Sequence, residues 1–149
     1  MQRVNEIMSR DVVHVAPTDS IRHAAQLMKR YDIGVLPVCD NRRLVGMVTD
    51  RDLAIRALSA GKPPESPIRD FTSTPAEWCF DDDAIDDIQR YMADAQLRLI
   101  PVVDHEKHLV GMVSLGDIAT RADGAAHEEL AKTVERVSQP APQAASQPK

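Results

Sequence analysis

An internal repeat is the feature of this chain that most restricts its fold. Residues 33–40 (IGVLPVCD) align with residues 97–104 (LRLIPVVD) at an offset of 64. Residues 44–53 (LVGMVTDRDL) align with residues 109–118 (LVGMVSLGDI) at an offset of 65, and the additional residue falls in a polar stretch where a turn tolerates insertion. Because order, spacing and residue class all match, we expect two copies of one structural unit.

Each copy predicts the element order β-α-β-β-α. Short apolar runs predict the strands, and the polar stretch Asp40–Arg43 between two of them predicts a hairpin. Apolar residues at helical spacing predict the helices, with Thr18 or Asp19 capping the first and Gly61 near the end of the second. The predicted strands are Val12–Val15, Val35–Val38 and Leu44–Val48 in the first copy, with Trp78–Phe80 opening the second.

The first helix of each copy carries an apolar stripe that we expect to face the core. In the second copy the carboxylates Asp81–Asp83 are expected at the helix start, where they favour the positive end of the helix dipole. The stripes are Ile21, Ala24, Ala25, Met28 and Tyr31 in the first copy, and Ile85, Ile88, Met92 and Ala95 in the second.

The repeat divides the chain into residues 1–64, residues 65–123 and a tail, residues 124–149. The first part carries a net formal charge of +3, the second −8, and the tail is neutral. Units of about 60 residues bury too little surface to be stable alone, so we expect the copies to pack as one pseudo-twofold body of the α/β (α+β) class. In the tail, residues 128–137 predict a helix and residues from Pro140 onward predict a disordered end.

Composition and charge exclude several classes of protein. The total formal charge of −5 argues against nucleic-acid binding through phosphate neutralisation. No apolar run approaches the about 18 residues of a membrane span, so no membrane association is expected. The two cysteines, Cys39 and Cys79, form no CxxC motif, and we expect reduced thiols in a cytoplasmic protein.

Both copies place a hydroxyl and a carboxylate at the same strand-to-helix junction. Thr49 is followed by Asp52, and Ser114 by Asp117, three residues on in each case. Free backbone N–H groups at such a junction attract phosphate, and a carboxylate there can accept hydrogen bonds from the two hydroxyls of a ribose. The same spacing is close to a capping box, so capping and ligand contact are both open, and the two roles can coexist.

The doubled β-α-β-β-α unit, its hydrophobic-hydrophobic-Pro strand and its Gly-hydrophobic-hydrophobic-Thr/Ser-x-x-Asp junction resemble a tandem pair of cystathionine-β-synthase (CBS) domains over residues 1–122. The resemblance implies a stand-alone CBS-domain protein whose effector is AMP, ADP, ATP, NAD or S-adenosylmethionine, bound between the repeats. It implies that Thr49 and Ser114 contact the ribose-phosphate, and Asp52 and Asp117 the ribose. By position, the walls around the base are Val13, Val35, Leu36 and Pro37 in one copy, and Glu77, Leu99, Ile100 and Pro101 in the other.

The copies differ at one position that bears on the phosphate. Arg98 precedes the Pro-containing strand of the second copy, whereas Gly34 stands at the equivalent place in the first. In adenylate-binding relatives a basic residue here often meets the phosphate, and the planar guanidinium suits that role. We therefore expect the second cleft to be the better anion site, served by Arg98 and by Arg51 from across the pseudo-twofold axis. The alternative for Arg98 is a surface arginine on a strand edge.

Other polar groups are interpreted as structural. The acidic run Asp81–Asp83 lacks the spacing of a calcium loop, and His105 and His108 flank a turn without enough further ligands for zinc, so no metal site is predicted. Cys39 and Cys79 are expected to be small core residues. GxSxG, HExxH, GxxxxGK[ST] and GxGxxG motifs are all absent, so no catalytic residue is assigned and an enzyme is not expected.

Three functional hypotheses follow. The leading one is a nucleotide sensor that forms a homodimer, with unlike repeats facing each other because of their opposite charge, and that signals to an effector protein in trans. The alternative is a ligand-free structural or dimerisation module. Gly34, Glu77 and the pair Leu115-Gly116 in place of Asp50-Arg51 leave room for it. An enzyme acting on a nucleotide ranks last.

Overall fold

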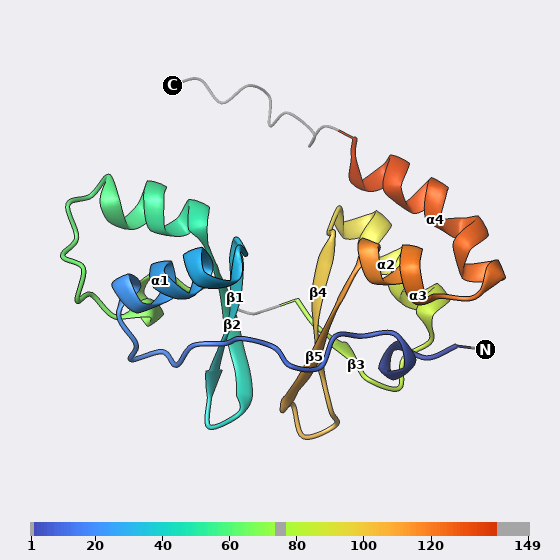
Figure 1. Ribbon diagram of the computed structural model, residues 1–149, viewed down its shortest axis with the longest axis horizontal. Coiled ribbons are helices and arrows are strands. Elements are labelled where there is room, and N and C mark those ends of the chain that lie inside the picture. Colours follow the sequence, from blue (N-terminus) through green and yellow to red (C-terminus); the bar gives the residue numbers. More distant parts are fainter. Residues whose placement is uncertain (1, 74–76, 140–149) are drawn as a thin grey trace.

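The structure is a computed structural model that describes residues 2–73 and 77–139, apart from the side chains of residues 125–127. Two similar halves stand side by side, with strands in the middle and helices on the outer sides (Figure 1). The helices are η1 (Val4–Glu6), α1 (Ile21–Tyr31), η2 (Asp52–Leu58), η3 (Ile68–Phe71), α2 (Ile85–Ala95), α3 (Leu115–Arg121) and α4 (Gly124–Val137). The strands are β1 (Val35–Asp40), β2 (Arg43–Thr49), β3 (Cys79–Phe80), β4 (Leu99–Val103) and β5 (Leu109–Ser114).

Each half contains an antiparallel hairpin, β1 with β2 and β4 with β5. The hairpin predicted at Asp40–Arg43 is confirmed. Its two turn residues, Asn41 and Arg42, have φ of 49° and 74°, as in a two-residue turn whose twist matches the flanking strands. In the second half, β3 adds to the hairpin in parallel with β4. The class is therefore α+β, with one small sheet in each half.

The strand predicted at Val12–Val15 is wrong. Within the described part of this segment only Val15 forms a bridge, with Val38 of β1. The reason is the path of the chain: Ser9 pairs with Met112 of the second half, and residues 10–14 cross from there to the first half. A segment that crosses between two sheets cannot pair along its length with either of them.

Helix α1 begins later than the sequence predicts. Ser20 is its cap, since the Ser20 hydroxyl accepts a hydrogen bond from the backbone N–H of His23 at 3.0 Å. The predicted caps Thr18 and Asp19 are wrong, and the Asp19 carboxylate instead accepts the Ala16 N–H at 2.8 Å in the preceding turn. The apolar stripe is also narrower than predicted: Ala24 and Met28 are buried, but Ala25 and Tyr31 are exposed.

Helix α2 shows a similar shift. The acidic residues in its first turn are Asp86 and Asp87. The predicted helix-start residues Asp81–Asp83 lie in the turn before the helix, where the Asp83 carboxylate accepts the Phe80 N–H at 2.9 Å. The stripe residues Ile85, Ile88 and Met92 are buried, whereas Ala95 is exposed.

The end of the η2 helix matches its prediction. The helical residues stop at Leu58, and Gly61 has φ of 70°, with its N–H donating to the Leu58 carbonyl at 3.0 Å. The left-handed conformation is the one in which glycine is favoured over other residues, so Gly61 terminates the helix as expected.

The two halves exchange their leading segments. Val4, Ile7 and Met8, from the start of the chain, lie in the core of the second half with α2 and β4. Ile68 and Phe71, from η3, lie in the core of the first half with α1 and β1. The core of each half is therefore completed by the leading segment of the other repeat copy.

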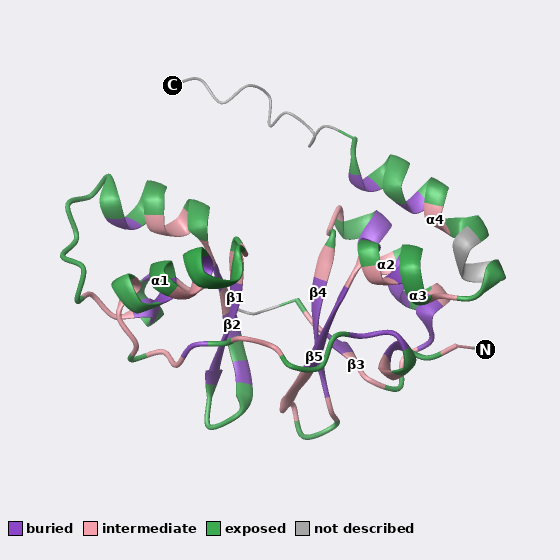
Figure 2. Ribbon diagram, in the orientation of Figure 1, coloured by how far each residue is buried: buried purple, intermediate pink, exposed green. Residues whose placement is uncertain are grey.

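The packing of the two halves against each other is confirmed. Leu44 of β2 donates its N–H to the Lys107 carbonyl at 3.1 Å, and Leu109 of β5 donates to the Arg42 carbonyl at 2.9 Å. A third buried cluster, made of Cys39, Leu44 and Val103, lies where the halves meet. Figure 2 shows the buried residues concentrated in these central strands.

Helix α4 confirms the helix predicted over residues 128–137 and breaks the symmetry of the halves. It packs on α2 and α3, on the outer side of the second half (Figure 1). The equivalent face of the first half, formed by α1 and η2, exposes Ile55 and Leu58 at 55% and 75%. Residues from Pro140 onward lie outside the described residues.

Candidate functional site

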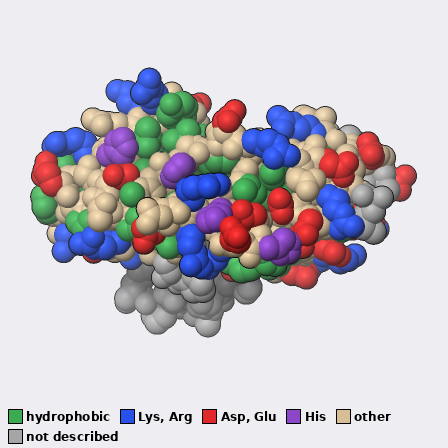
Figure 3. Space-filling view, turned by 90° about the horizontal axis from the view of Figure 1, so that it is seen from below, with side chains coloured by type: hydrophobic (Ala, Val, Ile, Leu, Met, Phe, Trp, Pro, Cys, Tyr) green, Lys and Arg blue, Asp and Glu red, His purple; other side chains and the backbone are tan. Residues whose placement is uncertain are grey.

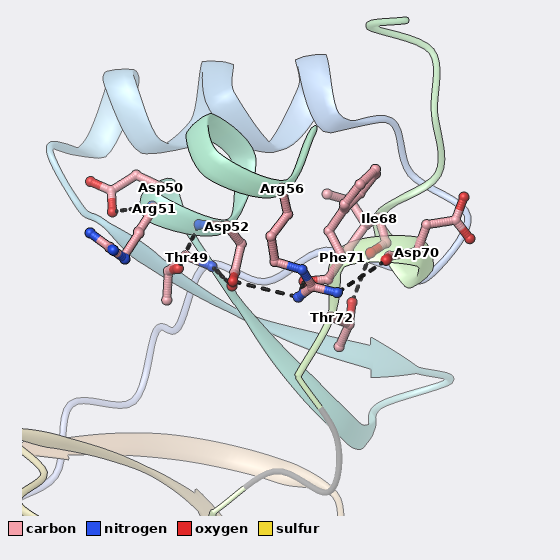
Figure 4. Close-up of polar contacts among 9 residues, drawn as sticks. All are labelled: Thr49, Asp50, Arg51, Asp52, Arg56, Ile68, Asp70, Phe71 and Thr72. Atoms are coloured by element: carbon pink, nitrogen blue, oxygen red, sulfur yellow. Dashed lines mark hydrogen bonds and ion pairs between the residues drawn. The ribbon is translucent and has the colours of Figure 1, made fainter. Parts of the chain in front are cut away.

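The first strand-to-helix junction is a reciprocal capping box. The Thr49 N–H donates to the Asp52 carboxylate at 2.9 Å, and the Asp52 N–H donates to the Thr49 hydroxyl at 3.0 Å (Figure 4). Each side chain thus satisfies a backbone donor that the helix itself leaves free. Because only one Asp52 oxygen is used in this way, capping leaves the other oxygen for a further contact.

That other oxygen meets Arg56, a residue that sequence reasoning missed. The Arg56 guanidinium lies 3.6 Å from Asp52 Oδ1 and donates to the Phe71 carbonyl at 3.1 Å (Figure 4). It also donates to the carbonyl of Asp70 at 3.4 Å. Arg56 thereby ties the first junction to the segment that enters the core from η3.

The second junction has the same capping box and a different surrounding. The Ser114 N–H donates to Asp117 Oδ2 at 2.9 Å, and the Asp117 N–H donates to the Ser114 hydroxyl at 3.0 Å. Arg121, which the repeat aligns with Arg56, donates to the carbonyl of Ile7 at 3.3 Å. The outer oxygen of Asp117 receives a 3.5 Å contact from the Ser9 hydroxyl, at the limit of a hydrogen bond. Asp117 is therefore held in place with weaker competition for its outer oxygen than Asp52.

The predicted wall residues fall into three groups by exposure. Val13, Val35 and Leu99 are half-buried and can contact a molecule in a cleft. Glu77 is exposed. Leu36 and Ile100 have no exposed surface and belong to the cores of the two halves, and Pro37 and Pro101 are buried as well. Val35 and Leu99, the first residues of β1 and β4, therefore offer side-chain surface to a ligand, as does Val13 in the crossing segment, whereas the buried wall residues do not.

The two predicted anion-binding arginines differ in their surroundings. Arg98 is exposed and donates from Nη2 to the hydroxyl of Ser138, just past α4, at 2.9 Å. Its carbonyl accepts the N–H of Leu115 at 3.1 Å, so its backbone adjoins the second junction. Arg51 is exposed beside the first junction (Figure 4). In the first half a side chain on Gly34 would meet the Asp50 carboxylate, whose Oδ2 lies 3.0 Å from an ideal Cβ.

A cavity of about 440 Å³ lies between the halves. Val12 and Val13 line it from the crossing segment, and Leu109 and Val110 line it from β5. Its charged lining is Arg10, Asp11 and Arg42. Of the predicted site residues, Val13 alone is in this lining; the two capping boxes and Arg98 are elsewhere.

Two groups of carboxylates and histidines lie near the turn between β4 and β5. His105 Nε2 is 2.8 Å from Asp82 Oδ2, and its ring stacks on Phe80 with centroids 4.4 Å apart. Asp81 completes this group, and the second group is Asp104, Glu106 and His108. Figure 3, which views the molecule from below, shows acidic and histidine side chains side by side. Each group is close enough to hold a cation, but Asp104 already accepts the N–H groups of its own turn.

Both cysteines are buried, as predicted. Burial raises the pKa of Cys39 to about 11. Burial, together with the nearby Asp83 and Asp81 carboxylates, raises the pKa of Cys79 to about 12. Thiols with such pKa values stay protonated at neutral pH and are poor nucleophiles.

The CBS domain family model matches residues 4–58 and residues 68–124, which is most of the chain. The fold, the repeated hairpin and the paired junctions thus define a tandem pair of CBS domains, and the chain belongs to the CBS-domain family. The structure also shows, over the described residues, no helix long and apolar enough to cross a membrane.

Three solved structures illustrate the relationship. Hypoxic response protein 1 of Mycobacterium tuberculosis is 37% identical over 121 residues, 80% of this chain and 84% of that protein. Its crystal structure with two coordinated zinc ions superposes with a TM-score of 0.72, covering 79% of this chain and 97% of that one, at 34% identity. The CBS domain pair of protein MJ0100, in complex with 5-methylthioadenosine and S-adenosylmethionine, has a TM-score of 0.68 at 27% identity, covering 80% and 94%. PAE2072 from Pyrobaculum aerophilum, in complex with AMP, has a TM-score of 0.71 at 25% identity, covering 88% and 99%.

Proposed function

We propose that this CBS pair is a regulatory module that binds an adenine nucleotide between its halves, mainly at the Ser114–Asp117 junction, and signals to a partner protein. The main observation behind the proposal is how the two carboxylate oxygens of Asp117 are hydrogen-bonded. Its inner oxygen is fixed by the capping box, and among the residues that the structure describes its outer oxygen has only the 3.5 Å contact from Ser9. A fixed carboxylate with a weakly engaged oxygen suits the two adjacent hydroxyls of a ribose. The relatives that bind AMP, 5-methylthioadenosine or S-adenosylmethionine support an adenosyl ligand.

The base is proposed to lie against the half-buried aliphatic side chain of Leu99 in the second cleft, and against Val13 and Val35 in the first. The phosphate depends on arginine more than on a helix dipole, since α3 has seven residues. Arg98 adjoins the second junction through its backbone and supplies the planar fork that phosphate favours. Arg51 is the proposed second cation. The first cleft, with Gly34 beside the Asp50 carboxylate and Arg56 on Asp52, is the weaker anion site.

A specific observation favours a second placement of the ligand. The inter-half cavity of about 440 Å³ is within the 300–1,000 Å³ typical of small-molecule sites. It combines apolar walls with two cations, Arg10 and Arg42, and one carboxylate, Asp11. Variants separate the placements: Arg98→Ala weakens a ligand at the second junction, whereas Arg10→Ala and Arg42→Ala weaken a ligand in this cavity.

The homodimer is proposed to form through the exposed face of the first half. Ile55 and Leu58 lie there among α1 and η2, and a groove of about 270 Å³ beside Leu53 and Leu58 is lined mainly by apolar residues. In the structure α4 occupies the corresponding face of the second half. Pairing of unlike repeats through their helices therefore needs α4 to move, and pairing of the two first halves does not.

Calorimetry and thermal unfolding of the full chain with AMP, ADP, ATP, NAD and S-adenosylmethionine test the proposal. A ligand present at 100 times its Kd should stabilise the chain by about 2.7 kcal/mol. Absence of binding by all five would overturn the nucleotide function and favour the structural module. Chromatography of the recovered nucleotide tests the enzyme hypothesis, which predicts turnover.

A further inference from the structure

Helix α4 is attached to the second half through a narrow inner face. Leu130, Thr133 and Val137 make its inner face, and the Thr133 hydroxyl donates to the Gln89 side chain of α2 at 3.2 Å. A solvent-open groove of about 310 Å³ runs beside this contact, lined mostly by charged side chains such as Arg90, Lys132 and Arg136. The contact between α2 and α4 thus combines a narrow buried strip with a polar surface groove.

The C-terminal end of α4 is fastened by one short segment, residues 94–98. Asp94 pairs with Arg136 at 2.5 Å, and the Gln96 amide donates to the Gln139 carbonyl at 3.2 Å. Arg98 donates to the Ser138 hydroxyl at 2.9 Å. The same segment leads into β4, and the Arg98 carbonyl is bonded to the N–H of Leu115 at the second junction. The end of α4 and the proposed phosphate site therefore share Arg98.

We propose that the end of α4 and the phosphate of a bound nucleotide compete for Arg98, so that ligand binding loosens α4 from the α2/α3 face. The proposal rests on the function proposed above, because it assumes that the phosphate reaches Arg98. A phosphate accepts charge-assisted, two-pronged hydrogen bonds from a guanidinium, which are stronger than the single bond to a neutral hydroxyl. If the Arg98 guanidinium turns toward the phosphate, its hydrogen bond to the Ser138 hydroxyl is lost.

The competition has a defined consequence for a partner. When α4 moves, the second half exposes the face that corresponds to the open α1/η2 face of the first half. Because the coupling is reciprocal, the ligand weakens the attachment of α4 by the same factor by which detaching α4 raises the affinity for the ligand. Loosening α4 by mutation is therefore a test that needs no knowledge of the partner.

The experiment uses the full chain with AMP and, as a second anion probe, inorganic pyrophosphate. We expect Ser138→Ala to tighten AMP binding by about two- to tenfold in calorimetry, the equivalent of one neutral hydrogen bond. We also expect AMP to speed amide hydrogen exchange in residues 128–137. Gln139→Ala is the matched control, because it keeps the backbone carbonyl that Gln96 binds, and it should leave both readouts unchanged.

The outcomes separate the two proposals. If AMP binds but Ser138→Ala does not change its Kd, or α4 exchange is unchanged, the competition is wrong and the nucleotide function stands. If neither AMP nor pyrophosphate binds, the competition for Arg98 is wrong, and the nucleotide function falls only if the other four ligands also fail to bind. If AMP binds equally to Arg98→Ala, the phosphate is elsewhere and the competition is wrong.

Discussion

The guanidinium of Arg56 lies 3.6 Å from the outer oxygen of Asp52 and holds the carbonyl of Phe71 at 3.1 Å. One side chain thus joins the first junction, its own helix and a segment from beyond the end of the first repeat. Arg121 holds the carbonyls of Ile7 and Met8 in the same way in the second half. Arg56 and Arg121 thus hold, by polar contacts, the same two exchanged segments whose apolar residues enter the cores. Each junction therefore depends on the leading segment of the other repeat copy.

Arg56→Ala should lower the free energy of unfolding by about 1 kcal/mol, because it removes hydrogen bonds to backbone carbonyls. The half-exposed ion pair with Asp52 adds little to that value. Urea unfolding monitored by circular dichroism measures the change. Arg121→Ala is the matched variant and should show a loss of similar size. An Arg56→Ala protein as stable as the parent would contradict the role.

The two junction carboxylates should contribute unequally to ligand affinity. Asp117→Asn keeps a capping oxygen but removes the charge, and we expect it to weaken AMP binding by at least about tenfold, the value of a charge-assisted hydrogen bond. Asp52→Asn should have a smaller effect, because Arg56 already engages that carboxylate. Calorimetry of both variants decides the point, with thermal unfolding as a control for folding. A larger loss in Asp52→Asn would place the main site in the first half.

The local features of this fold could be predicted from the sequence. The hairpin at Asp40–Arg43 and the helix end at Gly61 depend on residues close together in the chain, and both were found. The capping boxes also depend on local spacing. The crossing segment 10–14 could not be predicted, since its apolar residues resemble a strand and only the path from Ser9 to Val15 prevents pairing.

Contacts over long sequence separations account for the rest. The Arg98–Ser138 bond joins residues 40 apart, and nothing in the local sequence of either residue indicates it. The repeat aligns Arg56 with Arg121 and so marks both arginines as equivalent. The alignment does not show which groups an arginine binds, so the contact of Arg56 with Phe71 could not be predicted. Leu36 and Ile100 were predicted at the clefts, although they lie in the cores, because a motif names positions without giving the face of the strand.

The exposed first-half face should control self-association. If the homodimer forms there, Leu58→Ser should weaken it by at least about tenfold, since a buried leucine contributes about 1.5–3 kcal/mol. Val45→Ser is the control, because Val45 is an exposed apolar residue on β2 and not on the helical face. Light scattering over a dilution series measures the assembly. A monomeric parent, or a dimer that Leu58→Ser leaves intact, contradicts the proposed interface.

Gly111 of β5 should be essential for the close packing of Met8 and Ser9 against that strand. A Cβ there would lie 2.7 Å from the Ser9 carbonyl oxygen and 2.6 Å from Met8 Sδ, closer than real Cβ contacts. Gly111→Ala should therefore cost about 1–3 kcal/mol, as overpacking does. Gly116→Ala, in α3, meets only the Ser114 hydroxyl at 3.5 Å and should be neutral or stabilising by up to about 1 kcal/mol. Equal stability of the two variants in urea unfolding would refute the close approach.

His105 and Asp82, paired on the surface of the second half, should each have a shifted pKa because of the other. The hydrogen bond that the His105 ring donates to the Asp82 carboxylate, and then the charge of that carboxylate, raises the pKa of His105 above the usual 6.5. The same hydrogen bond lowers the pKa of Asp82 below 3.8. The histidine's contribution to stability is complete below its unfolded pKa and is lost as pH rises through the folded value. The contribution of the carboxylate is lost as pH falls through its own folded pKa, so the pair stabilises the fold between the two.

A proton NMR titration of the His105 ring measures this pKa directly. Asp82→Asn should move it back toward 6.5, because both the charge and the stronger acceptor are lost. Asp94→Asn, which removes a carboxylate paired with α4 instead, is the control and should leave the His105 titration in place. A His105 pKa at or below 6.5 in the parent chain would show that the 2.8 Å contact does not persist in solution.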